Sequence, residues 1–132
     1  MVVVDTNVLL DVVNRNPVWL TWSAGQMMQL AKIHELIINP IIYAEFSVTF
    51  VLLAEVEKSV SDLGLKVEDL PREAAFLAGK AFAQYRKLGG SKTGVLPDFI
   101  IGAHAMVLNS PLLTRDTRRY STYFPTVRLI TP

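Results

Sequence analysis

The 132-residue chain contains no cysteine, which excludes both a disulfide framework and a metal site built from thiolates. It has only two histidines, His34 and His104, and they are not spaced as a pair of metal ligands. The longest apolar stretch, residues 41–56, contains two glutamates and is too short and too polar to span a bilayer. The first residues lack the basic and apolar segments of a signal peptide. We therefore expect a cytoplasmic protein that does not insert into membranes.

The length and charge of the chain indicate the number of domains and the kind of partner. The length suits one domain, expected to cover residues 1–132, with one hydrophobic core. The net charge is only +1, but residues 1–71 carry four Lys/Arg against nine Asp/Glu, whereas residues 72–132 carry nine against three. A basic surface favours partners that bear phosphates. The hydrophobic content of 51% indicates either a dense core or apolar surface that faces a partner.

Strands and helices are expected to alternate along the chain. The first helix should cover residues 6–13, the next should include Trp19 and Ile33, and a third should begin with Asn39 as cap and continue toward Leu63. Later helices are expected from Pro71 to Gly89 and over residues 97–108. The helix after Pro71 should bury one apolar stripe, made of Ala75, Phe76, Gly79, Phe82 and Ala83. The expected strands cover residues 2–4, 36–38, 65–67, 111–114 and 127–130. This alternation predicts a parallel sheet covered by helices on both faces.

Four acidic residues should meet at one edge of this sheet. Asp5 follows the first strand, and Asp116 lies two residues beyond Thr114, where a later strand ends. Ligands of open α/β sheets bind outside the carboxyl ends of the strands. A flanking helix runs antiparallel to the strands, so its first turns lie near that same edge. Asp98 and Glu45 occupy such early helical positions.

Each acidic residue also has a structural explanation, except Glu45. Asp5 can cap the following helix, Asp98 can favour a helix start, and Asp116 can sit in a turn. Glu45 lies among apolar helical neighbours, where a carboxylate is costly unless a cation compensates it. Clustered carboxylate oxygens suit Mg²⁺ or Mn²⁺, one or two ions. Such an ion lowers the pKa of bound water and neutralises charge on a phosphodiester.

Polar and basic residues near the four carboxylates are further candidates. Thr114 and Asn7 are placed to hydrogen-bond a carboxylate or a water on the ion. Three arginines flank Asp116 and can bind RNA phosphates or lie in a solvated turn: Arg115, Arg118 and Arg119. His104 lies six residues after Asp98, off its helical face, and is interpreted as a core or interface histidine.

The same positions resemble the PIN-domain family, and in particular the VapC-type toxins of toxin–antitoxin pairs. The matching segments are Val4-Asp5-Thr6-Asn7-Val8-Leu9-Leu10, Tyr43-Ala44-Glu45, Leu96-Pro97-Asp98-Phe99-Ile100-Ile101-Gly102-Ala103-His104-Ala105 and Leu112-Leu113-Thr114-Arg115-Asp116. They occur in family order and span nearly the whole chain. The resemblance implies a PIN-like three-layer α/β fold, with helices flanking a parallel sheet of four to five strands in the order 3-2-1-4-5. It also implies a Mg²⁺- or Mn²⁺-dependent endoribonuclease that forms a homodimer and is inhibited by a small antitoxin protein.

The resulting hypothesis is metal-assisted hydrolysis of RNA, in which Asp5, Glu45, Asp98 and Asp116 hold the ion. Thr114 joins these four as a candidate catalytic residue. Two alternatives stay open: a catalytically silent PIN-like binding module, and a PIN nuclease that processes RNA without an antitoxin. Phosphatases of the haloacid-dehalogenase type usually require Asp-x-Asp at the first strand, and receiver domains require paired acids there. The sequence Asp5-Thr6-Asn7 fits neither pattern.

Overall fold

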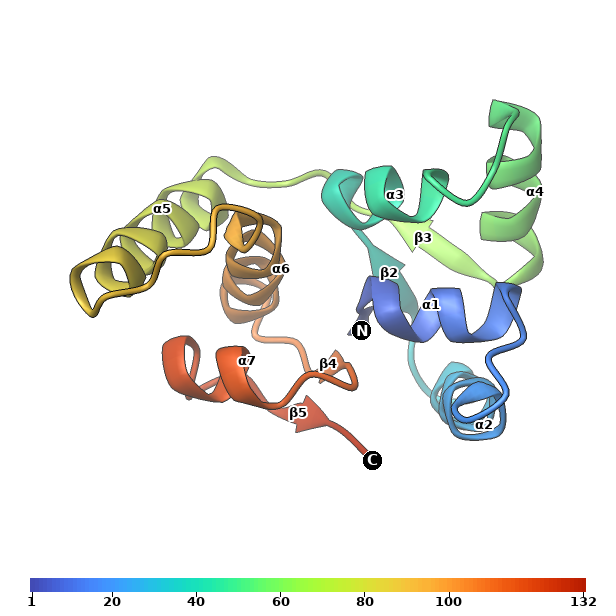
Figure 1. The fold of residues 1–132 in the computed structure, drawn as a ribbon. Helices are drawn as coiled ribbons and strands as arrows, with labels where there is room; N and C mark the ends of the chain where they lie inside the picture. Colours follow the sequence, from blue (N-terminus) through green and yellow to red (C-terminus); the bar gives the residue numbers. More distant parts are fainter.

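The computed structural model describes all residues, 1–132, and contains a five-stranded parallel sheet in the order β3-β2-β1-β4-β5 (Figure 1). The strands are β1 (Val2–Val4), β2 (Leu36–Ile38), β3 (Leu65–Val67), β4 (Leu112–Leu113) and β5 (Leu129–Ile130). The order that the family resemblance implied is therefore confirmed. Since β1 is central, its three valines are almost fully buried, as expected of a strand covered on both faces.

The last two strands are shorter than predicted. β4 was expected over residues 111–114 and contains only Leu112 and Leu113. Pro111 has no amide hydrogen to donate, whereas the Thr114 amide still donates a 3.1 Å bond to the Ile130 carbonyl. β5 was expected over residues 127–130 and contains only the last two of these. The pairing is nevertheless continuous, because Val3 aligns with Leu112 and Leu112 with Leu129. The carboxyl ends of β1 and β4 thus lie side by side.

Seven helices flank the sheet. They are α1 (Thr6–Val13), α2 (Leu20–Ala31), α3 (Pro40–Ser47), α4 (Leu53–Asp62), α5 (Arg72–Lys87), α6 (Leu96–Val107) and α7 (Arg118–Tyr123). The predicted first helix is confirmed at both ends, and Asn39 caps α3 through a bond from the Ile42 amide, 2.9 Å long. The short helix α7 was not predicted. None of the seven has the length and apolar character needed to cross a lipid bilayer.

The prediction of one helix from Asn39 toward Leu63 was wrong. α3 ends at Ser47, whose hydroxyl donates to the Tyr43 carbonyl, and α4 begins only at Leu53. A new start is stabilised there, because the Glu55 carboxylate accepts a 2.9 Å bond from the Leu52 amide. Most residues between the two helices are exposed, with Val48 at 86% and Val51 at 92%, whereas Phe50 is partly buried against the core. They form an apolar turn rather than a buried helical segment.

Two further expectations, about the end of α2 and about the buried face of α5, were also wrong. α2 ends before Ile33, which is 78% exposed. The buried stripe of α5 is shifted from the expected one: Ala74 and Ala78 are buried, whereas Phe76 is 61% exposed. The reason is that α5 packs along α6 and not on the sheet, so its inward face is set by a partner helix (Figure 1). Small alanines allow the two helices to approach closely.

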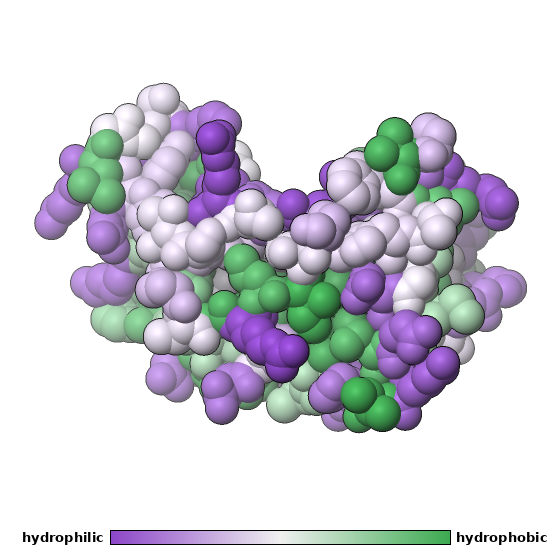
Figure 2. Space-filling model, turned by 90° about the horizontal axis from the view of Figure 1, so that it is seen from below, coloured by the Kyte–Doolittle hydropathy of each residue, from purple (hydrophilic) through white to green (hydrophobic).

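One contiguous core joins the sheet to the helices and includes the large buried side chains Phe46, Phe99 and Phe124. The helix α5 lies at one side of the molecule and α4 at the other (Figure 1). Seen from below, the surface is hollowed between these two sides (Figure 2). Gly64, which ends α4, has a φ of +67°, a conformation that favours glycine. The turn at Gly64 leads directly into the edge strand β3.

Candidate active site

Asp5 lies where β1 ends and caps α1, as its position in the sequence suggested. Its Oδ1 accepts a 2.7 Å bond from the Thr6 amide, and its Oδ2 accepts from the hydroxyls of Thr114 (2.7 Å) and Tyr120 (3.1 Å). The carboxylate is only 4% exposed. Burial raises the pKa of Asp5 to about 6, although the hydrogen bonds from Thr114, Tyr120 and Thr6 oppose this shift. Asp5 is therefore a fixed and poorly hydrated carboxylate.

Glu45 reaches the same region from α3. It lies at the sixth position of this helix, and its Oε1 accepts a 2.7 Å bond from the Thr6 hydroxyl. Burial raises the pKa of Glu45, and the negative charge of Asp98 raises it further, while the bond from Thr6 lowers it. Thr6 thus connects two acidic residues, since its amide binds Asp5 and its hydroxyl binds Glu45.

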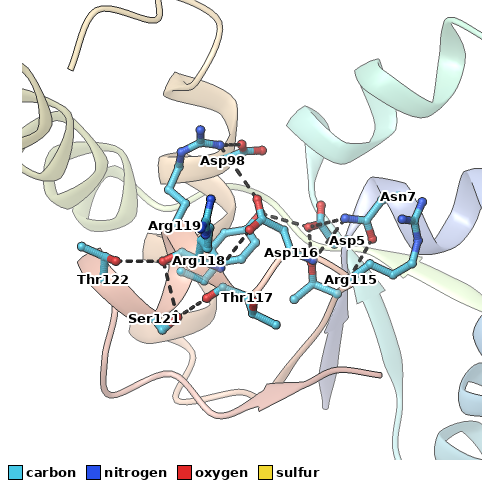
Figure 3. A network of polar contacts seen from close by, with 12 residues as sticks. Asp5, Asn7, Asp98, Arg115, Asp116, Thr117, Arg118, Arg119, Ser121 and Thr122 are labelled. Atoms are coloured by element: carbon cyan, nitrogen blue, oxygen red, sulfur yellow. Dashed lines mark hydrogen bonds and ion pairs between the residues drawn. The ribbon is translucent and has the colours of Figure 1, made fainter.

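Asp98 lies in the first turn of α6 and does not cap that helix with its side chain. It instead accepts a hydrogen bond from Nη1 of Arg119, on α7 (Figure 3). The same Nη1 lies 3.9 Å from Oδ2 of Asp116. Burial raises the pKa of Asp98, whereas the adjacent Arg119 guanidinium lowers it. One arginine therefore faces two of the four candidate carboxylates.

Asp116 follows β4 in the segment that leads to α7. Its amide donates a 3.0 Å bond to the Thr114 hydroxyl, and its Oδ1 accepts a 3.1 Å bond from the Arg118 amide. Thr114 is fully buried and links Asp116 to Asp5. Asn7 also connects these segments, because its Oδ1 accepts from the Arg115 amide at 3.2 Å. Thr114 and Asn7 thus hold the carboxyl ends of β1 and β4 together.

The structure brings the four carboxylates to one open pocket of about 300 Å³. Its lining consists of Asp5, Thr6, Asn7, Leu10, Glu45, Asp98 and Asp116. All but one of these residues are polar, so the pocket suits a charged ligand. No three acidic side chains are arranged around one point as metal ligands, and two of the four have other partners: Glu45 accepts from Thr6 and Asp98 accepts from Arg119. Coordination of one ion by three of them requires side-chain rotation.

The three candidate arginines lie in different surroundings. Arg118 is exposed, whereas Arg119 points at Asp98 and Asp116 (Figure 3). Arg115 points to the opposite side, where its guanidinium pairs with the buried Asp11. Its Cζ also lies 5.1 Å from the centre of the Trp19 ring. Binding of RNA by these arginines stays a prediction, and Arg115 already has a strong intramolecular partner.

Sequence reasoning missed two residues that hold the site in place. Tyr120 is fully buried and donates to Asp5 from α7, a helix that was not predicted. Burial and the nearby Asp5 charge raise the pKa of Tyr120 well above its usual value, so the phenol is protonated and can donate. Asp11 anchors Arg115, as described above. The only sequence signal for Asp11 was a charged residue among the otherwise apolar residues 8–13 of the first helix.

His104 is 1% exposed, which confirms its interpretation as a core histidine. Its Nδ1 lies 3.1 Å from Nδ2 of Asn39, whose Oδ1 already accepts from the Ile42 amide. The Asn39 amide group therefore donates to His104, which leaves the proton of the neutral ring on Nε2. Burial lowers the pKa of His104, in keeping with a neutral ring. This pair fixes the start of α3, the helix that carries Glu45.

Comparison with known proteins agrees with this geometry. The full length of the chain aligns with 99% of a chain in the crystal structure of VapBC2 from Rickettsia felis bound to a promoter DNA fragment, with 19% identity and a TM-score of 0.76. A chain of VapBC-1 from nontypeable Haemophilus influenzae has 20% identity and a TM-score of 0.73, with 99% of this chain and 98% of that chain covered.

A toxin–antitoxin complex from Klebsiella pneumoniae contains a third similar chain, with 21% identity and a TM-score of 0.71 over 100% of this chain and 98% of that chain. At these identities the likeness concerns the fold. No curated protein matches the sequence. The PIN domain family model, in contrast, matches residues 2–125, which include all four carboxylates. The chain therefore belongs to the PIN domain family.

Proposed function

We propose that this PIN domain is a metal-dependent endoribonuclease that hydrolyses RNA phosphodiester bonds in the acidic pocket. The observation that carries the proposal is the meeting of Asp5, Glu45, Asp98 and Asp116, from four separate segments, in one open and polar pocket. Carboxylates crowded in this way repel one another, and burial and mutual repulsion raise the pKa of three of them. Such an arrangement favours binding of a cation.

The donor chemistry fits Mg²⁺ or Mn²⁺, one or two ions. These ions prefer oxygen ligands and retain bound water, and the pocket offers carboxylate oxygens next to solvent. The four acidic residues would hold the ion after Glu45 and Asp98 turn from their present partners, Thr6 and Arg119. When bound, the ion would lower the pKa of a water molecule and neutralise charge on the phosphodiester.

The surrounding residues would keep the pocket in order and bind the RNA. Thr114 and Tyr120 fix Asp5 through their hydroxyls, and Asn7 fixes the segment after β4. Arg118 is exposed beside the pocket, where its guanidinium would bind a backbone phosphate. Contacts of this kind position RNA without selecting its sequence.

A cleavage assay tests the proposed activity. Purified protein is incubated with a fluorescent single-stranded RNA in Mg²⁺, in Mn²⁺ and in EDTA. Cleavage is expected only with metal, and Asp98→Asn should reduce the rate by at least about 100-fold if Asp98 binds the ion. Asp62→Asn is the matched control, since Asp62 is an exposed acid on α4. Metal-dependent binding of RNA without cleavage would instead support the silent binding module.

We further propose that the chain is the toxin of a VapBC-type pair, inhibited by a small antitoxin. The similar folds in three VapBC or toxin–antitoxin structures support this proposal. A largely apolar pocket of about 280 Å³ offers a place for an apolar antitoxin segment. Its lining comes mainly from α2 and consists of Val12, Ala24, Met27, Met28, Ala31, Leu36, Asp62 and Leu63.

Co-expression with the product of the neighbouring gene tests the toxin proposal. The two proteins should co-purify, and the complex should cleave RNA more slowly than the isolated chain. Met28→Glu should weaken the complex, because Met28 is 68% exposed at the apolar pocket, and should leave folding intact. Phe76→Glu, at a similarly exposed site on α5, is the control. If the neighbouring product neither binds nor inhibits, a PIN nuclease of RNA processing becomes the better assignment.

Homodimer formation is the last part of the proposal. The apolar turn between α3 and α4 exposes Val48, Val51, Leu52 and Leu53, each at least 60% accessible. Several large apolar side chains exposed in one short segment are characteristic of an interface, and two-fold dimers are the commonest oligomers. Light scattering at micromolar concentration should give the dimer mass, and Val51→Asp should give the monomer mass. A monomeric mass for the unaltered protein would contradict the dimer.

A further inference from the structure

Two adjacent arginines at the start of α7 have different roles in the structure. Arg118 is exposed and contacts Asp116 only through its backbone amide. Arg119 is 21% exposed at its side chain, and its Nη1 donates to Oδ2 of Asp98 and lies 3.9 Å from Oδ2 of Asp116. The guanidinium thus sits between two carboxylates of the acidic pocket (Figure 3).

Arg119 is the only basic side chain that forms an ion pair with any of the four carboxylates. Arg115 pairs with Asp11, and the remaining ion pairs involve exposed lysines on α4 and β3. Arg119 therefore supplies the only side-chain positive charge that is paired with the carboxylates of the pocket. It does so at the carboxylates of Asp98 and Asp116, which come from α6 and from the segment after β4.

The other carboxylates of the pocket have different partners from Asp98. No three acidic groups surround a common point, although all four line the same pocket. Asp5 and Glu45 are held by hydroxyl and amide donors, which carry no net charge. Asp98 alone is directly hydrogen-bonded to a cationic side chain. A divalent ion next to Asp98 would stand within a few ångströms of the guanidinium and be repelled by it.

We propose that Arg119 is a positioning residue that competes with the divalent ion for Asp98 and Asp116. It holds these two carboxylates as their counter-cation in the metal-free protein and leaves Asp98 when an ion binds. The inference rests on the proposed metal-dependent function. It adds that the affinity of the site for metal is set by this arginine as well as by the acidic residues.

Direct binding of Mn²⁺ to the purified chain, without RNA, tests the proposal. Isothermal titration calorimetry would compare the unaltered protein with Arg119→Ala and Arg118→Ala. Both variants lose one positive charge at neighbouring positions, so Arg118→Ala controls for the general electrostatic effect. Arg119→Ala should bind Mn²⁺ on the order of five-fold more tightly, as expected from loss of a partly buried ion pair. Arg118→Ala should change the affinity less than about two-fold.

Arg119→Lys provides a second variant that keeps the charge and most of the packing. It should bind Mn²⁺ with an affinity between those of the unaltered protein and Arg119→Ala, because lysine lacks the planar guanidinium. Thermal unfolding in EDTA checks that each variant is folded. Mn²⁺ binding that is unchanged or weaker in Arg119→Ala would overturn the inference and leave the metal site intact. Absence of Mn²⁺ binding in every protein would overturn the proposed metal-dependent function as well.

Discussion

The Arg115 guanidinium and the buried Asp11 carboxylate form a bidentate ion pair. Nε of Arg115 lies 2.8 Å from Oδ2 of Asp11, and Nη2 lies 3.0 Å from Oδ1. Ser23, on α2, donates a further 2.6 Å bond to Oδ2. The pair joins α1 and α2 to the segment that carries Asp116. The geometry of the acidic pocket therefore depends on an ion pair outside it.

Removal of the Asp11 carboxylate should strongly destabilise the protein. Asp11 is 2% exposed, so Asp11→Ala leaves the partly buried Arg115 charge and the Ser23 hydroxyl without their partner. We expect the free energy of unfolding to fall by about 3 kcal/mol, as is usual when one member of a buried pair is removed. Chemical denaturation measures the change. Asp62→Ala, which removes an exposed pair with Lys58, should cost less than about 1 kcal/mol. Equal losses in both variants would contradict the role of Asp11.

The metal-free protein should become less stable as the pH rises from about 4 to about 7. The pKa of Asp5 is raised to about 6 in the folded chain from an ordinary 3.8, so the folded state binds its proton more tightly than the unfolded state. Protonated Asp5 therefore stabilises the folded state. This stabilisation is complete when the pH is below the ordinary pKa of 3.8, and it is lost as the pH rises through the folded-state pKa of about 6. The shift is equivalent to about 3 kcal/mol. Denaturation in EDTA across this pH range measures it.

Asp5→Asn isolates the contribution of Asp5 to that profile. The variant keeps the shape of the side chain but cannot ionise. The difference in unfolding free energy between the variant and the unaltered protein should therefore change by up to about 3 kcal/mol between pH 4 and pH 7, in favour of the variant. Burial lowers the pKa of His104, which acts in the opposite direction, but it is common to both proteins and cancels. A difference that does not vary with pH would refute the account of Asp5.

Glycine-to-alanine substitutions should have opposite effects in two helices. A Cβ at Gly102, in α6, would lie 2.4 Å from Cδ2 of the buried Phe124 ring. Gly102→Ala should destabilise the fold by about 1–3 kcal/mol, because the ring must move within a packed core. A Cβ at Gly79, inside α5, meets no atom within 4 Å. Gly79→Ala should raise stability by about 0.5–1 kcal/mol through helix propensity. Thermal unfolding of both variants provides the comparison, and a stabilised Gly102→Ala would contradict the packing described.

Local signals in the sequence were enough to locate much of the fold. The valines of β1, Asp5 as the cap of α1, and the Asn39-Pro40 start of α3 each act through neighbouring residues. The break between α3 and α4 was not predictable in this way, because three of the intervening residues, Val48, Val51 and Leu52, are apolar and yet exposed in the structure. The inward face of α5 was also missed, since only its packing on α6 determines which side chains are buried.

Part of the candidate site could also be predicted from the sequence. Asp5 lies at a strand end and Asp98 at a helix start. In a parallel α/β sheet these two positions share one edge, which was sufficient to predict that the two carboxylates lie near each other. The partners of the arginines were not accessible to such reasoning: Asp11 and Arg115 are 104 residues apart, and Asp98 and Arg119 are 21 apart. Tyr120 lies 115 residues from Asp5. Contacts over these separations depend on the direction of each side chain in the folded protein.

The most direct test of the central claim measures RNA cleavage and Mn²⁺ occupancy in the same preparation. The rate of cleavage should rise in proportion to the fraction of protein with bound Mn²⁺, and both should be abolished by EDTA. Glu45→Gln and Asp98→Asn should lower occupancy and rate together, since both residues line the acidic pocket. Cleavage that continues undiminished in EDTA, or in both variants, would contradict the claim that the acidic pocket is a metal-dependent nuclease site.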